Sequence, residues 1–387
     1  MVERKKRKIP EKEENKKEVR NLAQEGFKRV AILGAGNGAH AFAAHLGMLG
    51  KEVNIYNKFP EELAAIKEKG AVEVEGVLEG VGPVNKVTTD IAEAVAGAEI
   101  ILVVVPAFVH RFMAQALAPH LVDGQIITIH PGRTGGVLEF AQVLKESGLK
   151  ADVKIAEAQT LLYACRISGP ARVAVKGLKK EVAVAAFPAR DTQAVLDRLC
   201  PVLPQFKAAA NVLVTSLDNI GAIFHPTTVL LNTGRIESKI PFKFYVDGMT
   251  ETVTKALAKV DSERVAIARA LGIEMESAAQ WLRRVYGSEG ENLHQLLHNT
   301  KAYWDIAAPT SMQVRYVLED IPTGLVPFAS LGESLGVPTP ACRAMVDLAC
   351  ILYDRDFWAE GRTVANLGLA GLNREEMLHF VTEGFRG

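Results

Sequence analysis

The stretch "FKRVAILGAGNGAHAFAAHLGMLGKEVNIYN", residues 27–57, places a glycine-rich turn and a helix-forming segment between two short apolar runs. Gly34, Gly36 and Ala39 match the G-x-G-x-x-G/A pattern. In that pattern the first glycine permits a tight turn, the second lets a pyrophosphate approach the backbone, and the small third residue lets the helix pack on the strand. The positive end of the helix dipole then faces the phosphates. The stretch therefore predicts a strand, turn, helix and strand that bind a dinucleotide.

The second predicted strand ends in Tyr56-Asn57-Lys58, where a site for NAD usually carries an acidic residue that binds the ribose 2′-hydroxyl. A neutral amide followed by a cation can instead accept a 2′-phosphate, which favours NADP(H), although a solvated Lys58 would leave NAD(H) equally acceptable. The residues expected to bind the cofactor are Gly34, Gly36, Asn37, Gly38, Ala39, Asn57, Lys58, Val105 and Pro106.

Further strands indicate a doubly wound α/β domain of the Rossmann type over residues 28–207. The run "AEIILVVVPAF" (98–108) is apolar throughout, as in a strand that is buried on both faces, and it ends at Val105 and Pro106. "QIITIHPGRTGG" (125–136) predicts another strand, followed by His130 and Arg133, either of which could contact nicotinamide or substrate. We expect "VKIAEAQ", "ARVAVKG" and "EVAVAAFP" to extend the same sheet to about residue 190.

Composition limits the partners of the protein. The 387 residues include 45 Lys and Arg and 45 Asp and Glu, so the net charge of zero favours small molecules over nucleic acids or anionic membranes. The 4 cysteines form no C-x-x-C pair, which argues against a zinc site or a disulfide framework. No apolar run is long enough for a membrane span, and we expect a cytoplasmic protein. Residues 1–27 are expected to form a charged tail outside the fold.

Helical periodicity dominates from residue 208 onward, as in "ETVTKALAKVDSERVAIARALG", and predicts a mostly α-helical second domain over 208–387. The active site is then expected in the cleft between the domains. In the apolar segment "NIGAIFHPTTVLLNTGRIE" (219–237), His225 is either a satisfied core histidine or an acid/base group. Apolar residues near the C-terminus could be buried in the monomer or in a homodimer.

Four motifs together resemble the octopine/nopaline (opine) dehydrogenases: "GAGNGAHA", "HPGRTGG", "GAIFHPTTVLLNTGRIE" and "APTSMQVRYVLEDIPTGLVPFASLGESLGVPTP". The resemblance covers nearly everything from residue 28 to the end. It implies an NAD(P)-dependent enzyme that reduces the imine formed between an L-amino acid and an α-keto acid, commonly pyruvate. By resemblance His225 is the general acid/base, Asp320 its carboxylate partner, and Arg315 the anchor for a substrate carboxylate.

Each of these roles also suits the chemistry of its side chain. Histidine both releases and accepts protons near neutral pH, a neighbouring carboxylate stabilises its protonated form, and arginine holds a carboxylate with two parallel hydrogen bonds. The plain alternative is that "RYVLEDIPTGLVP" is a turn with a surface ion pair, although its charges and its Pro and Gly favour a functional loop. Asn232, seven residues after His225, and Thr134 are the further candidates for substrate binding.

Two other functions fit the same layout. A β-hydroxyacid or ketopantoate-type dehydrogenase would reduce a carbonyl to an alcohol, but such enzymes generally use a lysine on the first inter-domain helix. This chain has no lysine between Ala210 and Glu237. The protein could also be a dinucleotide-binding sensor without catalytic turnover. In that case the presence of His225, Asp320 and Arg315 together would be a coincidence.

Overall fold

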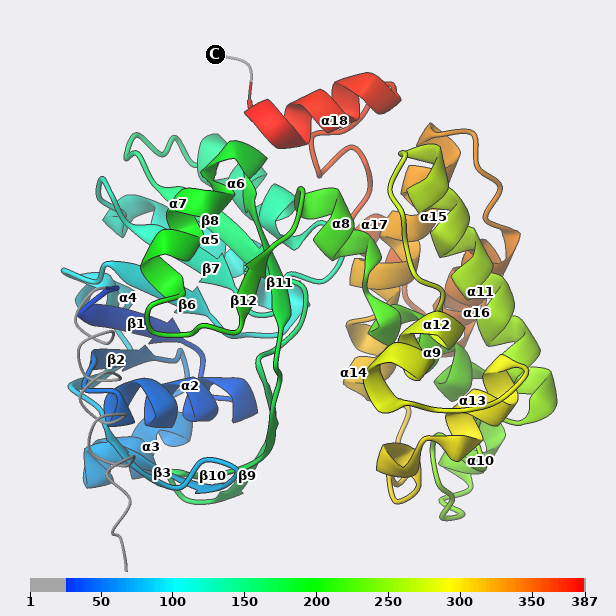
Figure 1. Cartoon of the computed structure of the whole chain (residues 1–387), viewed down its shortest axis with the longest axis horizontal. Coiled ribbons are helices and arrows are strands. Elements are labelled where there is room, and N and C mark those ends of the chain that lie inside the picture. The colour runs from blue at the N-terminus through cyan, green and yellow to red at the C-terminus, as the bar shows by residue number, and fades with distance from the viewer. Residues whose placement is uncertain (1–25, 386–387) are drawn as a thin grey trace, which may run out of the picture.

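The computed structural model describes residues 26–385; the predicted tail of residues 1–27 therefore lies almost entirely outside the described residues. Figure 1 shows a mixed α/β body beside a helical body, as the sequence predicted. The larger sheet has eight strands, in the order β12 (Phe206–Ala208), β11 (Val182–Phe187), β8 (Lys154–Ala158), β7 (Ile126–Ile129), β6 (Ile100–Val103), β1 (Arg29–Leu33), β2 (Glu52–Tyr56) and β5 (Lys86–Thr88).

Parallel pairing in the centre of this sheet brings the functional loops together. β1, β6, β7 and β8 run parallel, so their carboxyl ends meet at one edge. The glycine turn after β1, the Val105-Pro106 segment after β6 and the loop after β7 therefore lie at that edge, where ligands of doubly wound sheets bind. All four residues of β6 and of β7 are buried, which explains their continuous apolar sequence.

One predicted strand does not join the large sheet. "ARVAVKG" forms most of β10 (Arg172–Leu178), which belongs to a separate sheet ordered β4 (Gly80–Pro83), β3 (Ala71–Gly76), β10 and β9 (Tyr163–Gly169). Its residues alternate between buried and exposed, with Arg172 and Lys176 facing outward. Because charged side chains are costly to bury between a sheet and its covering helices, this strand suits a sheet with one solvated face. α2 (Asn37–Met48) contacts strands of both sheets.

Helices complete the dinucleotide-binding body. They are α3 (Pro60–Lys69), α4 (Ile91–Val95), η1 (Ala107–Val109), α5 (His110–Leu117), η2 (Ala118–His120), α6 (Gly136–Glu146), η3 (Ala189–Asp191) and α7 (Thr192–Leu199). α8 (Val212–Leu217) packs mainly on β11, β8 and α6 of the dinucleotide-binding body and leads into the helical body. The helical body contains α9 (Ile220–Leu231), α10 (Thr233–Glu237), α11 (Glu251–Ala270), α12 (Ala278–Tyr286), α13 (Leu293–Asn299), η4 (Lys301–Tyr303), α14 (Arg315–Leu318), the π-helix η5 (Ile321–Leu325), α15 (Val326–Ser334), α16 (Pro340–Tyr353) and α17 (Phe357–Glu360). None of the helices within residues 26–385 is both long and apolar enough to cross a membrane.

The last helix departs from the predicted division of the chain at residue 208. α18 (Arg374–Glu383) returns to the dinucleotide-binding body, where it contacts η3 and β11 (Figure 1). Phe380 packs against Phe187 at a centroid distance of 5.0 Å, and Arg190 pairs with Glu383 at 2.8 Å. The C-terminal segment thus links the two bodies: α18 follows the helical body in the chain, but its apolar face is buried against the dinucleotide-binding body.

Candidate active site

The segment "RYVLEDIPTGLVP" forms helix and not the loop that the sequence suggested. α14 runs into η5, in which the backbone N–H of Leu325 donates to the carbonyl of Asp320, five residues earlier, at 3.1 Å. This wide turn accommodates Pro322, which has no backbone N–H to donate. The turn also leaves Glu319 and Asp320 buried at the junction of the two bodies, so these charged residues must find partners within the protein.

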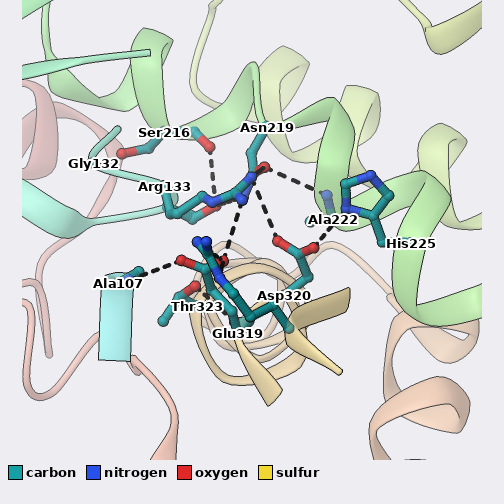
Figure 2. Close-up of polar contacts among 12 residues, drawn as sticks. Ala107, Gly132, Arg133, Ser216, Asn219, Ala222, His225, Glu319, Asp320 and Thr323 are labelled. Atoms are coloured by element: carbon teal, nitrogen blue, oxygen red, sulfur yellow. Dashed lines mark hydrogen bonds and ion pairs between the residues drawn. The ribbon is translucent and has the colours of Figure 1, made fainter. Parts of the chain in front are cut away.

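His225 and Asp320 lie in contact. His225 follows the first turn of α9, and its Nδ1 lies 2.7 Å from Oδ2 of Asp320 (Figure 2). The His225 side chain is 19% exposed, whereas Asp320 is 1% exposed. Since the carboxylate accepts the proton on Nδ1, Nε2 is the ring nitrogen that is free to exchange a proton. The buried partner therefore fixes the orientation of a ring that remains accessible.

Aromatic residues surround the other sides of the ring. Tyr316 stacks on the imidazole, with ring centroids 4.2 Å apart, and the hydroxyl of Tyr245 lies 3.3 Å from Nε2 of His225. Tyr245 in turn stacks on Tyr303 at 4.0 Å. Burial raises the pKa of Tyr245, so this hydroxyl keeps its proton and can donate it in a hydrogen bond to Nε2.

Arg133 provides the positive charge nearest to Asp320. It comes from the loop after β7, and its Nη1 lies 3.5 Å from Oδ1 of Asp320 and 3.4 Å from Oδ1 of Asn219. Burial alone would raise the pKa of Asp320, but the charge of Arg133, the hydrogen bond to His225 and the charge of Arg315 together hold that pKa below its usual value. The sequence predicted Arg133 and His130 together as candidates for contact with nicotinamide or substrate, and did not predict a contact between Arg133 and Asp320.

Glu319 joins the two bodies. Its Oε1 accepts a hydrogen bond from the backbone N–H of Ala107 at 2.8 Å, and its Oε2 lies 3.3 Å from Nη2 of Arg133. The same oxygen accepts from Nη2 and Nε of Arg315 at 2.6 and 3.1 Å. Arg315 is 58% exposed, so it lies at the rim of the site with its guanidinium turned toward Glu319. Its predicted role as a carboxylate anchor stays a proposal.

Two predicted substrate contacts have structural partners instead. Asn232 ends α9, and its Nδ2 donates to the backbone carbonyls of Thr228 and Gly248, both at 2.9 Å. The amide nitrogen is therefore used within the protein, and contact of Asn232 with substrate stays a prediction. Thr134 is fully buried, and its hydroxyl donates to the carbonyl of Ser216 at 3.0 Å. Asn219 caps α9, where its Oδ1 accepts from the N–H of Ala222, and its Nδ2 donates to the Thr134 hydroxyl at 3.3 Å.

His130 is a core histidine. Its Nε2 lies 2.9 Å from the hydroxyl of Thr128, and its ring packs between Phe42 and Phe206. Burial lowers the pKa of His130 to about 3, so the ring remains neutral over the whole physiological range. Of His130 and Arg133, the two residues of "HPGRTGG" predicted to contact nicotinamide or substrate, only Arg133 reaches the junction between the bodies.

The glycine turn has the shape that a dinucleotide requires. At Gly34 the backbone φ is +124°, and an added Cβ would lie 2.4 Å from the carbonyl oxygen of Val104, so only glycine fits there. At Gly36 an added Cβ would meet no atom within 4 Å, which leaves open space beside the start of α2. Gly36 makes no side-chain cap, so the first N–H groups of α2 can receive an anion.

Other predicted cofactor residues lie around this turn. Asn37 begins α2, and its Oδ1 accepts from the backbone N–H of Ile167 at 2.8 Å, while Gly38 packs against Leu161 and Ala39 is fully buried. At the end of β2 the amide of Asn57 donates to Glu62, and the ammonium of Lys58 lies 5.1 Å from the centre of the Phe112 ring. Val105 and Pro106 follow β6, directly before η1.

Glu157 and Arg362 are buried charged residues at the junction that sequence reasoning missed. Glu157 accepts hydrogen bonds from the N–H of Val137 at 2.8 Å and the hydroxyl of Thr215 at 2.5 Å. Arg362 donates to the carbonyls of Gly132 and Thr134, both at 3.0 Å. Neither residue lies in a recognisable motif. Their partners are far away in the sequence, so the contacts become visible only in the folded structure.

We expect Glu157 to make stability depend on pH. Burial raises the pKa of Glu157 to about 7, despite the hydrogen bonds from Thr215 and Val137 that lower it. A folded-state pKa above the unfolded value stabilises the fold at low pH, and this contribution falls as pH rises from 4.5 to about 7. The difference amounts to about 3 kcal/mol. Glu157→Gln, which imitates the neutral carboxyl, should therefore flatten the change in Tm between pH 5 and 8; an equal slope in both proteins contradicts the assignment.

Comparison with known proteins identifies the families that the chain resembles. The model for the NAD/NADP octopine/nopaline dehydrogenase alpha-helical domain matches residues 208–353, and that for the N-terminus of NAD-dependent glycerol-3-phosphate dehydrogenase matches residues 29–171. An opine dehydrogenase of Arthrobacter sp. (strain 1C) is 41% identical over 346 residues, which are 89% of this chain and 96% of that one. A vitopine synthase of Allorhizobium ampelinum is 28% identical over 90% of this chain and 97% of its own.

A solved octopine dehydrogenase with NADH and L-arginine superposes with a TM-score of 0.76 at 23% identity, covering 93% of this chain and 99% of that one. At this identity the superposition shows a shared fold. A ketopantoate reductase from Ralstonia eutropha superposes less well, with a TM-score of 0.57 at 21% identity over 85% of this chain and 99% of its own.

Proposed function

Because the chain belongs to the opine dehydrogenase family, we propose that His225 and Asp320 form the acid/base pair of its reaction. The protein is an NAD(P)-dependent oxidoreductase that joins an amino acid to an α-keto acid by reductive condensation. The observation that carries the proposal is the 2.7 Å contact between Nδ1 of His225 and the buried carboxylate of Asp320 at the junction of the two bodies. We propose pyruvate as the keto acid, as the family resemblance implies.

The proposed steps begin with proton transfer. Nε2 of His225 takes a proton from the ammonium of the amino acid, and the carboxylate of Asp320 stabilises the imidazolium that forms. The free amine attacks the keto carbon, which Arg315 orients through the adjacent carboxylate. In the adduct, a proton moves from the nitrogen to the former keto oxygen, which gives a neutral carbinolamine. His225 returns its proton to the carbinolamine hydroxyl, so water leaves and the protonated imine remains. The turn of Gly34 and Gly36 would hold the reduced nicotinamide cofactor, which would supply the hydride for the imine carbon; the product is then a secondary amine dicarboxylate.

The experiment that tests this function follows the loss of reduced-nicotinamide absorbance when the protein is mixed with pyruvate and a panel of L-amino acids. We expect oxidation only when the keto acid and an amino acid are both present. Oxidation with the keto acid alone would instead identify a hydroxyacid dehydrogenase. Mass spectrometry of the product separates the two outcomes, because an opine retains the nitrogen of the amino acid.

The choice between the two cofactors is a separate proposal. We propose that NADP(H) is preferred, because Asn57 and Lys58 follow the strand at the place where a 2′-phosphate would bind, although the Asn57 amide also donates to Glu62. Lys58→Ala should raise KM for NADPH roughly tenfold or more, since a charge-assisted hydrogen bond is lost, and leave KM for NADH nearly unchanged. Lys67→Ala, on the exposed face of α3, is the matched control. An equal change in KM for both cofactors would overturn the preference.

A homodimer is proposed from the exposed apolar residues of α16. Ile351 is 76% exposed, and Leu352 lies beside it, whereas Val346, Ala349 and Phe357 are buried in the monomer. Light scattering at micromolar concentration tests the proposal: the mass of a single chain would contradict it.

A further inference from the structure

Arg133 has an unusual position for a charged residue. It belongs to the dinucleotide-binding body, yet its guanidinium lies between two carboxylates of the helical body, 3.3 Å from Oε2 of Glu319 and 3.5 Å from Oδ1 of Asp320 (Figure 2). Its side chain is 19% exposed. Within residues 26–385, neither Nε of Arg133 nor Oδ1 of Asp320 has a hydrogen-bond partner, although both atoms are buried. The two groups are thus held together mainly by charge, without the short hydrogen bonds of a static ion pair.

The backbone around Arg133 is constrained to deliver this side chain. Its φ is +59°, in the left-handed region that residues with a Cβ rarely adopt. Arg362 donates to the carbonyls on either side, those of Gly132 and Thr134. The N–H of Thr134 donates to the carbonyl of Thr323 in η5 at 3.1 Å. Contacts from the helical body therefore hold the strained loop in place.

The facing helix leaves room for the guanidinium. At Gly221, one turn before His225 in α9, an added Cβ would lie 2.9 Å from Nη1 of Arg133 and 3.3 Å from Cε1 of His225. The absence of a side chain there lets Arg133 approach Asp320 from the side opposite to His225. One oxygen of Asp320 thus faces the ring and the other faces the guanidinium.

We propose that Arg133 is a positioning residue, which holds the Asp320 carboxylate ionised and turned toward His225 when the two bodies are docked. The loop that brings Arg133 leaves the same sheet edge as the glycine turn, so docking of the dinucleotide-binding body completes the acid/base pair. The inference rests on the proposed roles of His225 and Asp320. It extends them by making the pair depend on a residue of the other body.

Other charged or titratable groups also face this cluster. Glu319, Arg315 and Tyr316 approach it from α14, and Tyr245 approaches from the segment before α11. Lys179 and His110 lie near enough to Arg133 for its charge to lower the pKa of each, after burial. Replacing Arg133 with methionine also alters the electrostatic surroundings of Glu319, Lys179 and His110. The Lys variant keeps a positive charge at position 133, so the comparison of the Met and Lys variants isolates the effect of that charge.

The first test is the pH profile of kcat/KM in the condensation direction for Arg133→Met and Arg133→Lys. Loss of the charge should move the acidic limb of the Met variant to higher pH by about one unit or more, because the buried Asp320 then takes up a proton more readily. The Lys variant should keep the limb near its original position. Arg111→Gln, which removes an exposed pair with Glu146, is the control. An unshifted limb in an active Met variant would overturn the proposal.

The second test does not need activity. At pH 8 the urea midpoint of Arg133→Met should lie below that of the wild-type protein, and this difference should be smaller at pH 5. Adding Asp320→Asn should restore part of the midpoint at pH 8, because each change removes the uncompensated buried charge. A merely structural Arg133 would give losses that add, without recovery. Gly221→Ala keeps Arg133 in the sequence but crowds its guanidinium and the His225 ring, and it should shift the acidic limb in the same direction. If the wild-type protein fails to reduce imines, the proposed function is wrong. The urea midpoints of the Arg133→Met and Asp320→Asn variants still test the role of Arg133 in that case.

Discussion

Alanine in place of His225 should lower kcat for reductive condensation by roughly 10²–10⁴-fold, the range for loss of a general acid/base group. Without the imidazole, no group beside Asp320 can take the ammonium proton and later return it to the departing hydroxyl. Asp320 is buried and points one oxygen at the ring, so it cannot replace the histidine. Steady-state kinetics with saturating reduced cofactor, keto acid and amino acid measures the loss.

The matched control for this variant is His120→Ala, at an exposed histidine at the end of η2, which should turn over like the wild-type protein. Cofactor affinity, followed by nicotinamide fluorescence, should remain unchanged in both variants because the glycine turn lies on the other body. Unimpaired turnover in His225→Ala, with the cofactor still bound, would refute the acid/base assignment. A loss of turnover together with a loss of cofactor binding would indicate misfolding, which circular dichroism detects.

Asparagine in place of Asp320 should reduce kcat by a comparable factor, roughly 10²–10⁴-fold, for a different reason. An amide can donate a hydrogen bond to Nδ1, which would put the proton on Nε2 and leave the ring in the wrong tautomer, and it cannot stabilise the imidazolium. The loss should appear in kcat with little change in the KM for the cofactor. Pre-steady-state mixing with excess reduced cofactor separates the chemical step from product release.

The control for Asp320→Asn is Asp305→Asn, at a side chain that is 96% exposed and pairs with Lys243. Surface pairs of this kind contribute at most about 1 kcal/mol, so this variant should keep both activity and stability. If Asp320→Asn turned over at more than about a tenth of the wild-type rate, the carboxylate would be a structural partner of the ring and not part of the mechanism.

The sequence predicted the charged residues of the site less well than its other features, because it did not indicate that they are buried or which partners they have. The motif "RYVLEDIPTGLVP" identified Asp320, but its mixture of charges, Pro and Gly also indicated a loop. In the structure the wide turn of η5 absorbs the proline and buries Glu319 and Asp320. Charged side chains usually indicate exposure, and burial becomes favourable only because Arg133 and Arg315 supply the opposite charges. One of these arginines lies far away in the sequence.

The sequence by itself determined the elements whose signals are local. The strand, glycine turn and helix at residues 29–48 follow from β-branched residues, the steric demand at Gly34 and helix formers. The change to helical periodicity near residue 208 likewise needs no tertiary information. Family resemblance then pointed to His225 and Asp320.

Tertiary structure alone decided which distant groups meet. It separated β10 from the large sheet, returned α18 to the first body, and used the amide of Asn232 and the hydroxyl of Thr134 for backbone contacts. It also placed Arg133 beside Asp320, although the two residues are 187 positions apart in the chain. The physical reason is that the partner of a buried charge or amide depends on how the two bodies pack against each other. Local sequence patterns do not encode that packing.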